Sequence, residues 1–340
     1  MRKERVTMKY PKLLNKYDTI GVCAPSSGVQ ENLWGILDNA ELNVKRLGYK
    51  IIETESIRRN IKCVSNDSEI RAKEFMRLYS DNDVKVILPP WGGEFLMDML
   101  PYLDFEEIKG LKPKWIVGYS DITTLTFVLT VLCDIATIHG SNLMNMGFKE
   151  IHKYDLNVFD VIGKEESIQY NSEKCGGFTD TFDAYKLDKE TEYKNLNNEN
   201  MTFDGMIIGG CMDVLCKLIG TKYAPVNNFL EKYKDNGFIW TLESCEMNAG
   251  DIYRTLWQMK ECGWFKYCNG IIIGRPDGYS DTKDFTIKDA LEKIFYNIPV
   301  IYDADIGHVP PQLQLINGSY AKVEYDSNGK FSIHQKMDIK

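Results

Sequence analysis

The sequence of 340 residues contains few histidines and no pattern of metal ligands. None of its four histidines stands in an HExxH arrangement or in another zinc-binding spacing. Its nine cysteines form no CxxC pair, and an odd number of cysteines without an export signal is typical of reduced thiols in a cytosol. We therefore expect no metal site and a cytoplasmic location.

Long apolar runs and basic clusters are also missing. The most apolar stretch, residues 123–138, is rich in threonine and contains Asp134, so it is too short and too polar to span a bilayer. Residues 1–14 are basic but lack the apolar core and cleavage site of a signal peptide. The net charge of -8 and a pI near 5.3 argue against nucleic acid binding. We expect neither a membrane nor a nucleic acid polymer as a partner.

A dinucleotide-binding motif is absent as well. The first predicted strand leads into CAPSSG, residues 23–28, which does not supply the GxGxxG of a nucleotide fold. This absence counts against an oxidoreductase of the Rossmann type. We expect no cofactor.

The first half of the chain alternates short apolar runs with amphipathic stretches. Strands are predicted at residues 18–24, 49–54, 84–90 and 114–118, and helices at residues 31–47, at residues 67–79 and after Gly93. Strand and helix alternating at this spacing are typical of βαβ units and a parallel sheet. The first half is therefore predicted to be an α/β domain.

The chain changes character near residue 163. The next forty residues are polar and are predicted to be a loop over a cleft. Further strands are predicted at 205–210, 236–243 and 269–274, with a helix at 249–262 and a hairpin at 320–334 that turns at Asn328-Gly329. We predict an N-terminal domain at 1–165, a connecting loop segment at 166–204 and a smaller α/β domain at 205–340.

Ser120 occupies a corner between a predicted strand and a predicted helix, in KWIVGYSDITTL. Ligands of open α/β sheets gather at such strand ends, and the helix amides that follow can receive an oxyanion. A sharp turn would expose the hydroxyl as a nucleophile, although Ile122 stands where the G-x-S-x-G elbow has its second glycine. Alternatively, Ser120 only caps the helix, with Asp121 in its first turn.

A serine nucleophile needs a base, and the base needs an orienting carboxylate. Glu243 directly follows the apolar strand FIWTL, while Glu246 is a rival further into the loop. For the base, His308 lies between Gly307 and a stiff Pro-Pro pair, and His139 is a competitor because it also follows a strand. Each of these residues, taken alone, could be structural.

Two glycines follow another predicted strand. Gly92 and Gly93 allow backbone to approach a neighbour closely, so their amides are candidates for the oxyanion site together with the amide of Asp121. A plain turn is the alternative.

Four blocks together resemble the LD-carboxypeptidase family of serine peptidases, over nearly the whole chain from residue 20 to about residue 325. The blocks are PWGGEFLMDMLPYLDFEEIKGLKPKWIVGYSDITTLT, TLESCEMNAGDIYRTLWQMK, IIIGRPDG and DADIGHVPPQLQLINGSYAKV. The resemblance implies a catalytic triad of Ser120, Glu243 and His308. It also implies a Rossmann-like (flavodoxin-like) N-terminal domain, a smaller C-terminal domain that carries the acid and the base, and a homodimer.

The resemblance also implies hydrolysis of an amide next to a free carboxylate, without a metal. One branch of the family trims murein tetrapeptides, and another, the microcin C immunity peptidases, cleaves aminoacyl- or peptidyl-nucleotide conjugates. The WGGE form here is more similar to the second branch. A binder that sequesters such conjugates without cleaving them is a further alternative, against which the three ordered triad residues count.

This chain departs from the family pattern at two places. Cys211 stands where the family often has asparagine, and residues 165–205 contain no tryptophan to stack on a nucleotide base. Trp91 is a candidate for that stacking. Glu94 of the WGGE block and Arg275 of GRPDG are candidate contacts for substrate.

Overall fold

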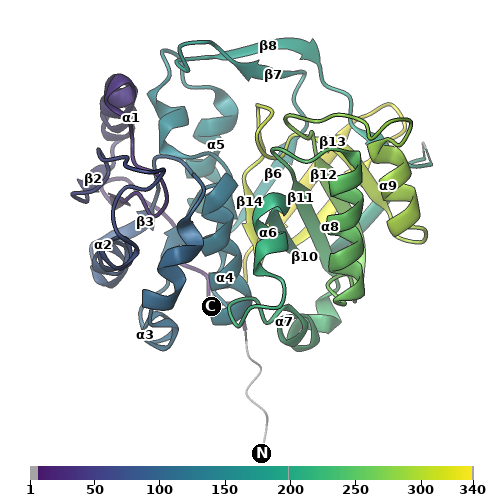
Figure 1. Ribbon diagram of the computed structural model, residues 1–340, viewed down its shortest axis with the longest axis horizontal. Coiled ribbons are helices and arrows are strands. Elements are labelled where there is room, and N and C mark those ends of the chain that lie inside the picture. Colours follow the sequence, from purple (N-terminus) through teal and green to yellow (C-terminus); the bar gives the residue numbers. More distant parts are fainter. Residues whose placement is uncertain (1–6, 198, 339–340) are drawn as a thin grey trace, which may run out of the picture.

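The computed structural model describes residues 7–197 and 199–338, which form two α/β bodies side by side (Figure 1). The basic start of the chain, residues 1–6, and the last two residues lie outside this range. An α/β architecture with a parallel N-terminal sheet and a second, mixed sheet confirms the predicted fold class.

The N-terminal body contains a parallel sheet of four strands in the order β2-β1-β3-β4, beside which β5 lies through a bridge from Val117 to Ile138. Its strands are β1 (Thr19–Val22), β2 (Lys50–Glu53), β3 (Val84–Ile87), β4 (Trp115–Ile116) and β5 (Thr137–His139). Its helices are η1 (Glu31–Leu33), α1 (Trp34–Arg46), α2 (Ser68–Ser80), η2 (Leu96–Tyr102), α3 (Phe105–Gly110), η3 (Ser120–Ile122), α4 (Thr123–Cys133), η4 (Leu143–Gly147) and α5 (Lys153–Ile162).

The second body is built on a mixed sheet of eight strands, in the order β6-β16-β15-β10-β11-β12-β13-β9, in which β10 to β13 are parallel. Its strands are β6 (Glu166–Tyr170), β9 (Lys194–Asn195), β10 (Met201–Cys211), β11 (Phe238–Glu243), β12 (Cys268–Gly274), β13 (Val300–Ala304), β15 (Tyr320–Tyr325) and β16 (Phe331–Lys336). Its helices are α6 (Met212–Leu218), α7 (Val226–Tyr233), η5 (Lys234–Asn236), α8 (Ala249–Glu261) and α9 (Ile287–Ile294).

The expected connecting loop at 166–204 is not a loop. It contributes both edge strands of the large sheet, β6 and β9, and a separate hairpin of β7 (Lys174–Phe178) and β8 (Tyr185–Glu190) that arches over the top of both bodies (Figure 1). Polar residues alternate along these exposed strands, so their β-propensity is weak and the sequence pattern missed them. The division into domains at these residue numbers stays a prediction.

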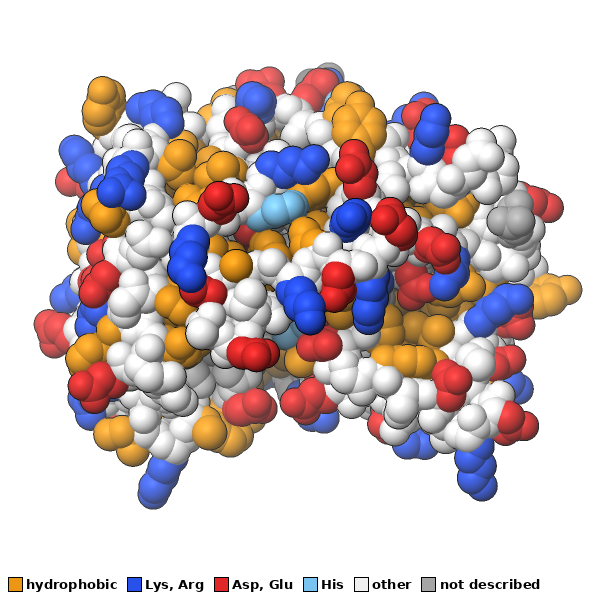
Figure 2. Space-filling view, turned by 90° about the horizontal axis from the view of Figure 1, so that it is seen from above, with side chains coloured by type: hydrophobic (Ala, Val, Ile, Leu, Met, Phe, Trp, Pro, Cys, Tyr) orange, Lys and Arg blue, Asp and Glu red, His pale blue; other side chains and the backbone are white. Residues whose placement is uncertain are grey.

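The predicted hairpin near the C-terminus is present as β15 and β16, which pair in antiparallel register around the turn that contains Gly329 at φ +81°. Within residues 7–197 and 199–338, no helix has both the length and the apolar character that a membrane span requires. Acidic and basic side chains are interspersed on the face seen from above in Figure 2, without a large area of one sign.

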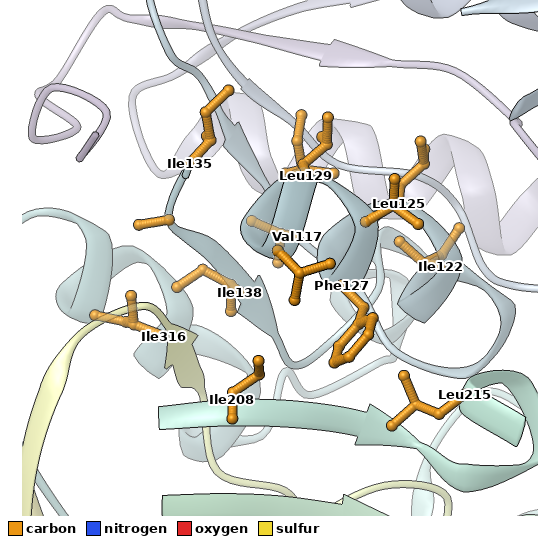
Figure 3. Close-up of a cluster of buried hydrophobic side chains, with 14 of the residues drawn as sticks. Val117, Ile122, Leu125, Phe127, Leu129, Ile135, Ile138, Ile208, Leu215 and Ile316 are labelled. Atoms are coloured by element: carbon orange, nitrogen blue, oxygen red, sulfur yellow. The ribbon is translucent and has the colours of Figure 1, made fainter. Parts of the chain in front are cut away.

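Helix α4 joins the two bodies. It combines apolar residues with four threonines, and all of its residues except Leu132 are buried, as expected for a helix packed on every side. Figure 3 shows Phe127 of α4 close to Ile208 of β10 and Leu215 of α6, which belong to the second body. One hydrophobic core therefore runs through both bodies.

A short strand pair makes the second junction. β14 (Leu315–Asn317), which follows the loop of His308, pairs antiparallel with β5, and Leu315 lies opposite His139. The junction therefore fixes the loop of His308 to the end of the N-terminal sheet.

Candidate active site

Ser120 lies directly beyond β4 in a strained conformation. Its φ of +62° is in the left-handed region, which is uncommon for residues other than glycine and is often found where function requires it. Neither η3 nor α4 has a side-chain cap, and the Ser120 hydroxyl has no hydrogen bond to a described residue. The corner therefore presents the hydroxyl and does not use it to begin the helix.

Gly92 packs against this corner. A Cβ atom placed on Gly92 would lie 2.8 Å from Ser120 Cβ and 2.9 Å from the backbone nitrogen of Asp121, closer than side chains allow. The WGGE loop therefore lies against both the side chain of Ser120 and the backbone amide of Asp121. Gly93, at φ +147°, presses instead against Ser26 and Ser27 of the first loop.

The side chain of Asp121 ties two loops to the corner. Its Oδ2 accepts hydrogen bonds from Ser26 Oγ at 2.5 Å and from the backbone nitrogen of Leu96 at 2.9 Å. Buried Arg71 donates from Nη1 to the carbonyl oxygens of Pro25, at 2.6 Å, and Phe95, at 3.0 Å. Burial raises the pKa of Asp121, although the hydrogen bonds that its carboxylate accepts act in the opposite direction.

The support that Ser26 and Arg71 give to this corner was not predicted from the sequence. The partners are separated by up to 95 positions in the chain, so local patterns carried no signal of their contact.

Glu243 and His308 form a buried pair. His308 Nδ1 lies 2.8 Å from Glu243 Oε2, at the carboxyl end of β11, and the Glu243 side chain has no exposed surface. Gly307, at φ +91°, lies so close to the carboxylate that a Cβ atom would come within 2.6 Å of Glu243 Cγ. Only glycine therefore fits before His308.

The pair shifts the pKa of both partners. Burial opposes the ionisation of Glu243, but the charge and the hydrogen bond of His308 outweigh it and lower the pKa of Glu243. Burial likewise disfavours the charged form of His308, but the Glu243 carboxylate outweighs it and raises the pKa of His308 well above its ordinary value. Glu246, the alternative candidate for the acid, is exposed, and its backbone N–H donates a hydrogen bond to the Asp213 carboxylate.

The imidazole of His308 lies beside the corner of Ser120. Its ring meets the ring of Tyr119, the residue before Ser120, edge to face with centroids 4.9 Å apart. The described hydrogen bonds include none between Ser120 and His308; such bonds are often long in a site without ligand. The structure thus joins Glu243 and His308 and places this pair next to Tyr119, the neighbour of Ser120 in the chain.

The other histidines differ in their surroundings. His139 is fully buried, with its Nε2 3.8 Å from the second oxygen of Glu243. His152 is the N-cap of α5, and exposed His334 pairs with Glu166. Within the part of the chain that the structure describes, no three potential ligands form a group that could hold a metal ion.

The expected role of Arg275 is not supported by its contacts. Its guanidinium forms a buried ion pair with Asp305 at 2.5 Å and donates to the carbonyl oxygens of Asp303 and Val309. These contacts tie the guanidinium to the loop that carries His308, and a contact with substrate stays a prediction. Arg275 therefore acts on the site through that loop.

The remaining candidates are placed differently. Glu94 is exposed at the rim of the WGGE loop, whereas Trp91 is half-buried and donates its indole N–H to the carbonyl of Ser27 at 3.2 Å. Cys211 lies opposite Glu243 in the sheet, with its thiol 3.5 Å from a carboxylate oxygen of Asp213. A buried thiol therefore occupies the position beside the catalytic acid candidate.

Both halves of the chain match one family. The model of the LD-carboxypeptidase N-terminal domain matches residues 20–140, and that of the LD-carboxypeptidase C-terminal domain matches residues 204–323. A Vibrio cholerae protein whose name assigns it to the carboxypeptidases is 26% identical over 333 residues, 94% of this chain and 96% of that protein. The microcin C7 self-immunity protein MccF of Escherichia coli is 24% identical over 298 residues, 84% of each chain.

Solved structures share the fold. An MccF-like protein from Bacillus anthracis has a TM-score of 0.84 at 25% identity, covering 96% of this chain and 99% of that chain. The muramoyltetrapeptide carboxypeptidase from Oxalobacter formigenes has a TM-score of 0.75 at 20% identity, covering 94% and 98%. From the two domain matches, the chain belongs to the LD-carboxypeptidase family of serine-type carboxypeptidases.

Proposed function

We propose that Ser120, Glu243 and His308 are the catalytic triad of this hydrolase. The observation that carries the proposal is the hydrogen bond of 2.8 Å between buried Glu243 and partly buried His308, near a serine held at positive φ. The Nδ1 that faces Glu243 leaves Nε2 of His308 as the nitrogen that can reach a hydroxyl. The charge of Glu243 stabilises the imidazolium that forms when His308 takes a proton.

The reaction is acyl transfer in two steps. His308 accepts the proton of Ser120 as Oγ bonds to the amide carbon, and then gives this proton to the leaving nitrogen as the C–N bond breaks. A water molecule, deprotonated by His308, next attacks the ester carbon, and His308 returns this proton to Ser120 Oγ as the C–O bond breaks, which releases the acid and the free serine. The amides of Asp121 and of Gly92 or Gly93 receive the oxyanion of each tetrahedral intermediate.

The substrate that we propose is an aminoacyl- or peptidyl-nucleotide conjugate of the microcin C kind, cleaved next to a free carboxylate as a defence against the toxin. The WGGE block and the MccF-like structure from Bacillus anthracis support this choice. Solved structures of MccF hold glutamyl sulfamoyl guanosine and aspartyl sulfamoyl adenosine. Trp91 and Glu94 are the residues that we assign to this substrate.

A murein tetrapeptide is the second candidate. The absence of tryptophan from residues 165–205 favours it, because three of the aromatic residues there, in the β7–β8 hairpin, are engaged with one another. Phe178, Phe182 and Tyr185 of the β7–β8 hairpin pack around buried Phe148, with the ring centroids of Phe178 and Phe182 4.6 Å apart. None of them is a free stacking platform in this arrangement.

Hydrolysis of the two substrate classes by the purified protein separates these proposals. Release of amino acid from an aminoacyl sulfamoyl adenosine, but not of D-alanine from a murein tetrapeptide, is the expected result. The reverse result would assign the protein to wall recycling. Ser120→Ala is expected to lower kcat about 10³-fold or more with folding intact, and unchanged hydrolysis would refute the triad.

A fluorophosphonate probe tests the alternative of a binder without catalysis. Labelling of wild type but not of Ser120→Ala is expected, since the probe reacts with an activated serine. Tight binding of the conjugate without labelling or turnover would instead support a sequestering protein. We further propose a cytoplasmic homodimer, as the family resemblance implies, which light scattering on the purified protein tests.

A further inference from the structure

The second oxygen of Glu243 faces a second imidazole. Oε2 is bonded to His308, whereas Oε1 lies 3.8 Å from His139 Nε2, a little beyond hydrogen-bond distance. Both side chains are fully buried, and neither Oε1 nor either ring nitrogen of His139 has a hydrogen-bond partner among the described residues. Buried polar atoms are rarely left in this way, so the two groups are natural partners for each other.

The backbone around His139 is held in place from the second body. His139 is paired with Leu315 across the β5–β14 junction, and the amide of Ser141 donates to Gln314 Oε1 at 3.0 Å. β14 follows the loop of His308. One short strand thus fixes both imidazoles relative to the carboxylate between them.

Burial keeps His139 neutral. Burial lowers the pKa of His139 to about 4. The charge of Glu243 acts to raise this pKa, whereas the charge of His308 acts to lower it further. A neutral imidazole has one N–H donor and one acceptor, and only the donor is favourable next to a carboxylate. The titratable groups that face this cluster are Glu243 of β11, His308 of the loop after β13, Cys211 at the end of β10, Cys245 of the loop after β11, and Tyr119.

We propose that His139 is a positioning residue that donates Nε2–H to Glu243 Oε1, an inference that rests on the proposed triad. A closing movement of about 0.8 Å brings the atoms to hydrogen-bond distance. The carboxylate is then held at both oxygens, which fixes its plane and, through Nδ1, the direction in which His308 presents Nε2. Because the donor is neutral, the negative charge of Glu243 remains available to His308.

Three variants test the proposal through kinetics. His139→Leu removes the donor and is expected to lower kcat/KM about 10- to 100-fold, mainly through kcat. His139→Gln keeps a neutral N–H and is expected to recover most of this loss. His334→Gln, a change to an exposed histidine outside the site, is the control and is expected to leave both parameters unchanged. Equal activity of His139→Leu and wild type would overturn the proposal.

Nitrogen NMR of histidine-labelled protein tests the same proposal without turnover. In the Ser120→Ala variant, His139 is expected to remain neutral between pH 8 and pH 5, with the proton on Nε2. A proton on Nδ1, or a cationic His139 at pH 7, would overturn the proposal even if the Leu variant failed to fold. Failure of wild type to cleave either substrate would count against the proposed function and not against this assignment.

Discussion

Replacement of Asp305 by alanine is predicted to destabilise the protein severely, because it leaves the Arg275 guanidinium without its buried partner. The Asp305 side chain has no exposed surface and that of Arg275 is 11% exposed. Asp305 also accepts hydrogen bonds from Ser172, from the backbone nitrogen at 2.6 Å and from Oγ at 2.8 Å. The change therefore leaves the charge of Arg275 without its counter-charge and the backbone N–H of Ser172 without its acceptor, whereas Ser172 Oγ keeps its hydrogen bond to Thr191 Oγ1.

The magnitude follows from burial. Removal of one member of a buried ion pair costs about 3–5 kcal/mol, a large part of the roughly 5–15 kcal/mol by which folded proteins are stable. Lys194 and Asp303, on the adjacent strands β9 and β13, provide the comparison, since this pair is 3.0 Å long but Lys194 is 48% exposed. Lys194→Ala is expected to cost about 0–1 kcal/mol.

Urea unfolding at pH 7, followed by tryptophan fluorescence, measures these free energies. A double-mutant cycle of Asp305→Ala and Arg275→Met isolates the pair, and the double variant is expected to lose less than the sum of the single losses. The kcat of Asp305→Ala is expected to fall as well, since Asp305 begins the loop that carries His308. A cost for Asp305→Ala no larger than that of Lys194→Ala would refute the reasoning.

Three further predictions concern the corner, the pair and a buried acid. Gly92→Ala is expected to abolish most hydrolysis and to lower thermal stability, since its Cβ would lie 2.9 Å from Ser120 Oγ and 2.9 Å from the backbone nitrogen of Asp121; retained kcat would contradict the packing. Activity is expected to fall as pH drops through a His308 pKa above the ordinary 6.5, and Glu243→Gln to move this midpoint to lower pH. Burial raises the pKa of Asp155 from 3.8 to about 7, so its contribution to stability falls as pH rises between these values. Asp155→Asn removes this cost. The difference in unfolding midpoint between the variant and wild type is therefore expected to favour the variant more at pH 8 than at pH 5, and a difference that does not depend on pH would argue against the raised pKa.

The position of three candidate residues at or after strand ends could be predicted from the sequence, whereas their shared catalytic role stays a prediction. Ser120, Glu243 and His308 each follow an apolar run and carry side chains that such a position does not otherwise need. Because the carboxyl ends of neighbouring parallel strands meet at one edge, local patterns and chain order together indicate convergence. His139 was identified only as a rival to His308, whereas the structure places both on the same carboxylate.

Contacts between distant loops could not be predicted in the same way. The ion pair of Arg275 with Asp305 could not be predicted, because the two residues lie 30 positions apart and nothing local indicates their pairing. The strands β6 and β9 were missed since edge strands exposed to water need few apolar residues. In each case the interaction depends on tertiary structure that a window of sequence does not contain.

Burial of α4 on all sides restricts how the two halves of the molecule can move or be separated. Opening them like a hinge would expose a helix that has almost no polar face, together with the side chains of β10 and α6 that cover it. A fragment ending after α5 would carry the same apolar surface into water and would be prone to aggregate. We therefore expect substrate to enter through small displacements of surface segments, such as the β7–β8 hairpin, and not through separation of the two bodies.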